Sequence, residues 1–456
     1  MNNQPLESPV TGAEAPSEHT PLGLGSAMFL VAASMIGAGV YTTSGFTLAA
    51  LGSPAWVLVA WATGGVIAIC GAICYGALAR ELTESGGEYL FLSRKLHPIA
   101  GLMAGWVSLL AGFTGAIAFA ATTFEAYLGW QDAMPKGVIA TLVVVLAAIL
   151  HTLGVRPGAR VQDFVVILKF LLIAAFVVIA VAMRSSAVVD VPAETLTNEA
   201  VPWTAFSLTF ATQLMYISLS FSGFNAAVYI AGEVSNASRN VPRAMLWGTC
   251  LVTLCYMLLN AVFVLAAPSE AIVGQPDVAT KAAEAIAGDT FASFVRVVIL
   301  LGLFTSVSAM IMSGPRVYAK MAEDGFLPGW FRFSGQIAGK PPVAAIWTQA
   351  ALGIVVIHVS DLERLLSYLG FTLSVSAALT ASLLFWVRGK SGVRIRPLLY
   401  PITPIVFVGG TLLAATLSAV NSPMQAAVGL GTIAFGALLY PWYAWREEQR
   451  RKATGE

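Results

Sequence analysis

Long apolar runs without alternating polar positions make up most of the chain. A helix needs roughly 20 apolar residues to cross a bilayer, whereas the strands of a membrane barrel alternate apolar and polar residues. The pattern therefore predicts an all-α integral membrane protein with twelve transmembrane helices. These lie at approximately 23–50, 54–79, 98–129, 138–154, 162–183, 203–232, 243–267, 291–319, 342–359, 362–387, 398–420 and 424–445.

The composition agrees with a lipid bilayer as the main surroundings. Hydrophobic residues make up 57% of the 456 residues, charged residues 11%, and the mean hydropathy is +0.78. A soluble domain carries about 25% charged residues. The net charge of +1 gives no reason to expect nucleic acid as a partner. There is no GxxxxGK[ST] motif, so this chain is not expected to hydrolyse ATP, and no cofactor is expected.

The four cysteines all lie in apolar runs. Cys70 and Cys74 are one helical turn apart, a spacing that a metal pair can use. No nearby His or carboxylate completes such a site, so we interpret the cysteines as small buried apolar residues and expect no metal.

Lys and Arg residues gather at alternate ends of the predicted helices. Of the 25, 19 lie on one side, five on the other, and Lys169 lies inside the fifth run. Cytoplasmic loops carry the excess of positive residues, so both termini are expected on the cytoplasmic side of the cell (inner) membrane. Residues 1–21 contain no Lys or Arg, unlike a signal peptide, and are expected to form a disordered cytoplasmic tail.

Two helices contain glycines and polar residues midway through the membrane. The first contains Gly37 and Gly39, and the sixth contains Gly223 surrounded by the polar residues Ser220, Ser222 and Asn225. A helix broken there leaves backbone N–H and C=O groups unpaired, which is tolerated only around a cavity or ligand. The alternative is close helix packing through small residues, with Ser and Asn bonding across the interface. Because the two helices are five apart, they occupy matching positions of an inverted repeat, which favours a midplane substrate site.

Four stretches, in order along the chain, carry a resemblance to a known family. They are Ile36-Gly37-Ala38-Gly39-Val40-Tyr41, the segment 81–90 with Ser85-Gly86-Gly87-Glu88-Tyr89, the segment 224–234 followed by Arg239-Asn240-Val241-Pro242-Arg243-Ala244, and the segment 316–328 with Glu323-Asp324-Gly325-Phe326-Leu327-Pro328. The chain thereby resembles the amino acid–polyamine–organocation superfamily, and within it the amino-acid permeases of the L-type amino acid transporter branch.

The resemblance implies a LeuT-like fold in which helices 1–5 and 6–10 are inverted repeats and two further helices are peripheral. The implied bounds are 22–183 for the first repeat, 184–202 for an external loop, 203–388 for the second repeat, 389–445 for the last two helices and 446–456 for a cytoplasmic tail.

It also implies that the carboxylate of an amino acid binds N–H groups at the first break, where the dipole of a half-helix favours an anion. The ammonium would bind carbonyls near Ile36 and in 219–222. The family often places an aromatic gate four residues before the glycine of helix six, and Leu219 stands there, with Phe221 close by. The substrate-binding residues implied in this way are Met35, Ile36, Gly37, Ala38, Gly39, Leu219, Ser220, Phe221, Ser222, Gly223 and Asn225.

Lys169 is flanked by apolar residues on both sides. A lysine at such depth destabilises the protein unless it is partnered or neutral, although its long side chain can also extend to the interface. A helix rises about 13.5 Å from Arg160 to Lys169, nearly half the bilayer core, which disfavours that alternative. In several members of the resembling family, a helix-five lysine takes the place of the second sodium ion. Lys169 is therefore expected to gate or couple transport, as a fixed charge or as a proton carrier.

These observations predict a secondary active amino-acid transporter that works by alternating access, either an exchanger or a proton-coupled permease, for small to medium neutral amino acids. A polyamine or cationic amino-acid permease is the alternative. It would need a carboxylate in the cavity, for which Glu125 is the candidate, although Glu125 also fits a place at the membrane interface. An intramembrane enzyme or a channel would need a catalytic cluster or a filter, and neither pattern is found, so the chain is not expected to be an enzyme.

In heterodimeric relatives of the family, a cysteine between helices three and four joins a glycoprotein subunit. The corresponding segment 129–137 contains no cysteine. No disulfide-linked heavy subunit is therefore expected.

Overall fold

The computed structural model describes residues 22–84, 87–130, 133–153, 159–183, 202–332, 343–389, 392 and 394–454. The expectations for the tail 1–21 and for most of the loop 184–202 lie outside these residues. Every predicted apolar run coincides with a helix or with consecutive helices.

The first half contains α1 (Leu24–Met35), α2 (Ala38–Leu51), α3 (Pro54–Glu81), α4 (Gly87–Lys95), α5 (Pro98–Val107), the π-helix η1 (Ser108–Gly115), α6 (Ala116–Leu128), α7 (Val138–Thr152) and α8 (Ala159–Met183). The second half contains α9 (Trp203–Ser220), the 3-10 helix η2 (Ala226–Glu233), α10 (Ala237–Ala266), α11 (Ser269–Ile272), α12 (Val278–Glu323), η3 (Gly329–Phe331), α13 (Val343–Val359), α14 (Leu362–Ser382), η4 (Leu383–Phe385), α15 (Ile402–Pro404), η5 (Ile405–Gly409), α16 (Gly410–Asn421) and α17 (Pro423–Thr454). The last helix continues to Thr454, beyond the predicted end at 445.

The helices have the length and hydropathy of membrane spans. In the described part of the chain, seven are long and apolar enough to cross a bilayer, and α1 with α2 forms an eighth that is bent by 42°. Three apolar segments are shorter: α7, the segment 167–182 of α8, and α13. The structure is thus that of an all-helical membrane protein.

The helix α8 shows how the apolar runs divide between lipid and core. Phe164, Ile167, Leu171 and Val178 are exposed apolar residues at helical spacing. The opposite face, which includes Leu172 and Phe176, is buried against α10 and α12. A helix that is apolar all round and still exposes one face fits a bilayer, where lipid covers that face.

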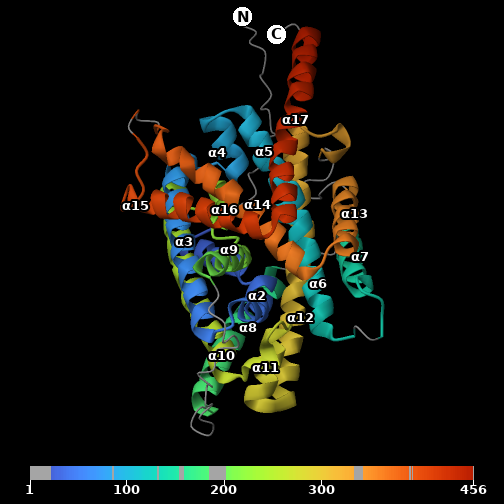
Figure 1. The fold of residues 1–456 in the computed structure, drawn as a ribbon. Helices are drawn as coiled ribbons and strands as arrows, with labels where there is room; N and C mark the ends of the chain where they lie inside the picture. The colour runs from blue at the N-terminus through green and yellow to red at the C-terminus, as the bar shows by residue number, and fades with distance from the viewer. Residues whose placement is uncertain are drawn as a thin grey trace, which may run out of the picture.

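The two broken helices lie at the centre of the bundle. The helix α2 packs against α9, α3 packs along α10, and α12 packs against α6 and α8. Figure 1 shows α4, α5 and the C-terminal end of α17 at one end of the bundle and α11 at the other. The breaks in the first and sixth helices therefore lie between the two ends, among several packed helices.

Candidate functional site

The first helix is interrupted between Met35 and Ala38. The backbone of Ile36 (φ −74°, ψ 83°) and of Gly37 (φ −127°, ψ −156°) is not helical, so α1 stops and α2 starts again at an angle. Within the described residues, no backbone acceptor bonds the N–H groups of Ala38 and Gly39. These groups carry the positive end of the α2 dipole, and such a helix start is suited to an anion.

The sixth helix is interrupted after Ser220. Gly223 has φ +105°, a conformation that side-chain-bearing residues rarely adopt, and a Cβ there would lie 2.8 Å from the carbonyl oxygen of Ser34. The carbonyls of Leu219 and Phe221 accept bonds from nearby backbone N–H groups. In the described part of the chain, the carbonyl of Ser222 has no backbone partner. Glycine is required here both by its backbone conformation and by the contact with α1.

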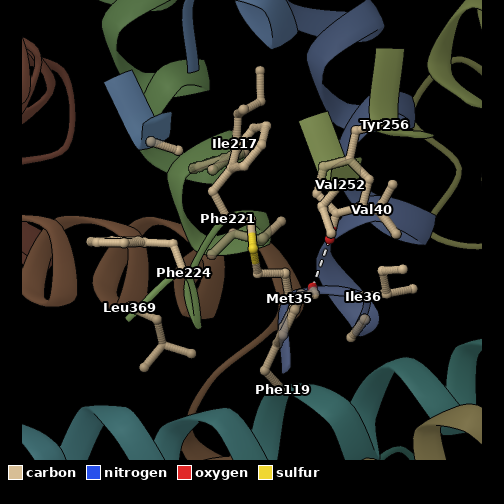
Figure 2. Packing of buried hydrophobic residues seen from close by; sticks show 14 of the residues in the cluster. Met35, Ile36, Val40, Phe119, Ile217, Phe221, Phe224, Val252, Tyr256 and Leu369 are labelled. Atoms are coloured by element: carbon tan, nitrogen blue, oxygen red, sulfur yellow. Dashed lines mark hydrogen bonds between the residues drawn. The ribbon is translucent and has the colours of Figure 1, made fainter. Parts of the chain in front are cut away.

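The hydroxyl of Tyr256, on α10, connects the two breaks. It lies 2.6 Å from the carbonyl oxygen of Met35 and 3.0 Å from that of Ser220. Figure 2 shows Tyr256 reaching Met35, with Phe221 close to both. The Tyr256 ring also contacts Phe221 and Trp61, with ring centres 5.2 Å and 5.4 Å away. The sequence pattern does not identify Tyr256 as a site residue, because a tyrosine inside an apolar helix does not show which groups its hydroxyl bonds.

A cavity of about 470 Å³ opens onto both breaks. The structure brings every predicted substrate-binding residue to this cavity, and Lys169 also lines it. On one side the lining extends to Ser34 of α1, Glu88 of α4 and Tyr229 of η2. Most of the remaining lining is apolar, so a few backbone and polar groups face a largely hydrocarbon wall.

Leu219 and Phe221 both line the cavity, at the place where the family resemblance puts an aromatic gate. The Phe221 side chain is buried, and its ring packs between Trp61 and Tyr256. It therefore forms part of the cavity wall in this conformation.

Lys169 is buried on α8, and its Nζ donates a 2.9 Å hydrogen bond to the carbonyl oxygen of Ile36. This carbonyl is freed by the break in the first helix. Gly302 on α12 makes room for the lysine side chain, since a Cβ on Gly302 would lie 2.7 Å from Lys169 Cε. The ammonium thus takes one of the carbonyls that the family resemblance implied for the substrate's ammonium group.

Glu125 does not line the cavity. Its two carboxylate oxygens accept hydrogen bonds from the backbone N–H groups of Gly137 (2.7 Å) and Ala140 (2.9 Å), at the start of α7. A carboxylate at a helix start stabilises the unpaired N–H groups there. Taking Glu125 as the candidate carboxylate of the cavity was therefore wrong.

The carboxylate that lines the cavity is Glu88. It is buried and accepts three hydrogen bonds: from Tyr75 Oη at 2.6 Å, Asn225 Nδ2 at 3.2 Å and Ser376 Oγ at 3.0 Å. Burial raises the pKa of the Glu88 carboxyl, and the three donors oppose that rise. Glu88 stands in one of the stretches that carry the family resemblance, but the polar loop around it gives no sign that it is buried.

Comparison with known proteins agrees with these features. The amino acid permease family model matches residues 22–440. The chain is 24% identical over 418 residues to the serine/threonine exchanger SteT of Bacillus subtilis, covering 90% of this chain and 93% of that protein. It is 24% identical over 433 residues to the human large neutral amino acids transporter small subunit 2, covering 92% and 79%. It is 24% identical over 452 residues to the mouse b(0,+)-type amino acid transporter 1, covering 95% and 91%.

Proposed function

Because the chain belongs to the amino acid permease family, we propose that it is a secondary active transporter of small to medium neutral amino acids, working by alternating access as an exchanger or a proton-coupled permease. The observation that carries the proposal is that both helix breaks open onto one and the same cavity. It supplies free N–H groups from one break and a carbonyl from the other, which are the groups that the two ends of an amino acid require.

The proposed topology has twelve spans, with 1–5 and 6–10 as inverted repeats and two peripheral helices. The pairing of α1 and α2 with α9 and η2 supports it, since these broken helices are five spans apart. The distribution of Lys and Arg supports cytoplasmic termini. With this orientation, α4 and η2 lie on the cytoplasmic side of the breaks.

In this conformation the cavity faces the cytoplasm. Its lining reaches α4 and η2 on the cytoplasmic side. On the opposite side, the N–H of Gly274 donates a 2.9 Å hydrogen bond to the carbonyl of Gly45, and this closes α2 against the segment after α11. The alternate state would open that contact and close the cavity around α4 and η2.

In the proposed binding pose, the substrate carboxylate lies at the N–H groups of Ala38 and Gly39, and the ammonium lies near the carbonyl of Ser222. The backbone then recognises what all amino acids share, and the wall selects the side chain. The serine/threonine and large neutral amino-acid specificities in the names of two relatives support a neutral substrate. The b(0,+)-type relative keeps a cationic substrate as the alternative. The three donors around Glu88 favour the neutral class, because a substrate cation would have to compete with them.

We assign Lys169 a coupling role, because it ties α8 to the broken first helix. We also propose that the chain works without a disulfide-linked subunit, since 129–137 contains no cysteine. A partner that reductant releases on a denaturing gel would contradict that part.

The test is uptake into proteoliposomes that contain the purified protein. A panel of labelled amino acids is offered with and without a pH gradient, and with and without unlabelled amino acid inside. We expect uptake of small neutral amino acids that a pH gradient or internal substrate stimulates. If no amino acid in the panel is taken up under any of these conditions, the proposed function is wrong.

A further inference from the structure

Glu88 is the carboxylate of the cavity, yet in the described part of the chain its hydrogen bonds are all to protein side chains. Three elements meet at it: Tyr75 comes from α3, Asn225 follows the break of the sixth helix, and Ser376 comes from α14. A buried carboxylate with three donors has its acceptor sites largely filled. Its contacts therefore suit the positioning of a neighbour better than direct capture of a ligand.

The neighbour that faces the substrate is Asn225. It is half-buried, lines the cavity, and donates its Nδ2 to Glu88 Oε1 at 3.2 Å. A side-chain amide has a donor end and an acceptor end, and the partner decides which way it points. Because Glu88 Oε1 accepts, the amide must turn its NH2 group toward Glu88, and the carbonyl Oδ1 then points away from it. In the described part of the chain, Oδ1 has no hydrogen-bond partner.

We propose that Glu88 is a positioning residue for substrate selection: it fixes the amide of Asn225 so that its oxygen is offered to a hydroxyl on the substrate side chain. This inference rests on the proposed function and deepens it, since it names the substrate class as amino acids with a side-chain hydroxyl, of which serine and threonine are the smallest. An apolar side chain at the same place would displace water from Oδ1 without supplying a donor, and a polar group left unpaired in the complex weakens binding.

The arrangement holds in either protonation state of Glu88. A proton on Oε2 would be donated to Ser376, whose hydroxyl can accept as well as donate, and Oε1 would still accept from Tyr75 and Asn225. The same reasoning makes Glu88→Gln a conservative variant, because the glutamine amide oxygen can replace Oε1 and its NH2 can replace the protonated Oε2. Glu88→Met keeps a similar length but removes the acceptor.

The experiment compares substrates that differ only in the hydroxyl. Inhibition constants of serine and 2-aminobutyrate, and of threonine and valine, are measured against labelled alanine uptake in proteoliposomes. For the wild type we expect the hydroxyl compound to bind roughly three- to tenfold more tightly in each pair, the range of one net hydrogen bond. The preference should fall to about one in Glu88→Met and in Asn225→Ala.

Two variants distinguish positioning from a general structural effect. Glu88→Gln should keep the preference, and so should Ser376→Ala, which removes only the donor at Oε2. A wild-type preference near one would overturn the inference whatever the variants do, including the case in which Glu88→Met fails to fold. So would a preserved preference in an active Glu88→Met protein, or its loss in Glu88→Gln. Alanine uptake with no hydroxyl preference rejects this inference alone, whereas the absence of all amino-acid uptake rejects the proposed function as well.

Discussion

Replacing Lys169 by Met tests how α8 is coupled to the broken first helix. Methionine keeps most of the side-chain volume beside Gly302 and removes the ammonium that bonds the Ile36 carbonyl. A hydrogen bond from a charged group contributes about 1.5–3 kcal/mol. If that bond is present in only one of the two end states of the cycle, its loss shifts their balance by about 10- to 150-fold. The proposed substrate contacts at Ala38 and Gly39 stay in place, so equilibrium binding should change much less.

Stability should change much less than transport. Removing the charge ends the cost of desolvating it, but the Ile36 carbonyl loses a donor, and these two effects on the free energy of unfolding oppose each other. We therefore expect Lys169→Met to melt close to the wild-type temperature in detergent and to transport at least tenfold more slowly in proteoliposomes. Loss of transport together with a large fall in melting temperature would indicate damage to the fold instead.

A second substitution perturbs the same contact from α12. A Cβ on Gly302 would lie 2.7 Å from Lys169 Cε, so Gly302→Ala should displace the lysine from the Ile36 carbonyl and slow transport as well. Because both substitutions break one contact, the double variant should be no slower than the slower single variant. Gly431→Ala is the matched control, since no atom lies within 4 Å of a Cβ there. Additive losses in the double variant would contradict a shared mechanism.

The same transport assay tests whether the Lys169 ammonium takes the place that a sodium ion would occupy in a sodium-coupled transporter. Transport by the wild type is measured with sodium present and with choline in its place, and the rate should be the same. Strong sodium stimulation of the wild type, or an unchanged rate in Lys169→Met, would refute the assignment of Lys169.

Three further outcomes are expected. Gly39→Val and Gly223→Val should abolish binding of labelled substrate while the protein still elutes as a folded species in detergent. A Cβ on Gly39 would lie 2.9 Å from the Cα of Ser220, and Gly223 has φ +105°. Wild-type affinity in both variants would contradict the two-break site. Glu125→Gln should lower the free energy of unfolding by about 1–2 kcal/mol through loss of the α7 cap and leave the KM for substrate unchanged, as measured by thermal melting and uptake. Arginine and putrescine should compete with labelled alanine at least tenfold more weakly than serine does, and a stronger competition by either would move the protein to the cationic or polyamine class.

Both helix breaks could be predicted from the sequence because each leaves a local sign. Glycines at Gly37, Gly39 and Gly223 interrupt apolar runs, and the hydrocarbon core of a bilayer makes an unpaired backbone there exceptional. Lys169 could be singled out for the same reason, since a lone charge among apolar residues needs a partner. In each case a polar or charged group in the hydrocarbon core needs a partner, so a few residues are enough to predict where the chain departs from a plain membrane helix.

Gly302 and Tyr256 show what the same reasoning cannot supply. A single glycine in an apolar helix fits many kinds of close packing, and the contact with Lys169 Cε exists only because α8 and α12 lie together. A tyrosine in an apolar helix likewise does not reveal that its hydroxyl reaches the carbonyls of Met35 and Ser220. These residues support the site through contacts between helices that the order of residues does not specify.

The two glutamates illustrate the difference most clearly. Both are buried in the structure, and burial requires each to have partners, although the sequence around Glu88 does not show that it is buried. The partners of Glu125 are 12 and 15 residues further along the chain, at the start of the next helix. Those of Glu88 are 13, 137 and 288 residues away, on three separate elements. The partners of Glu125 lie nearby in sequence, so this carboxylate stabilises the start of one helix. The partners of Glu88 come from α3, the sixth-helix break and α14, so its hydrogen bonds depend on how these three elements are arranged. This difference makes Glu88, and not Glu125, the carboxylate to examine for substrate selection.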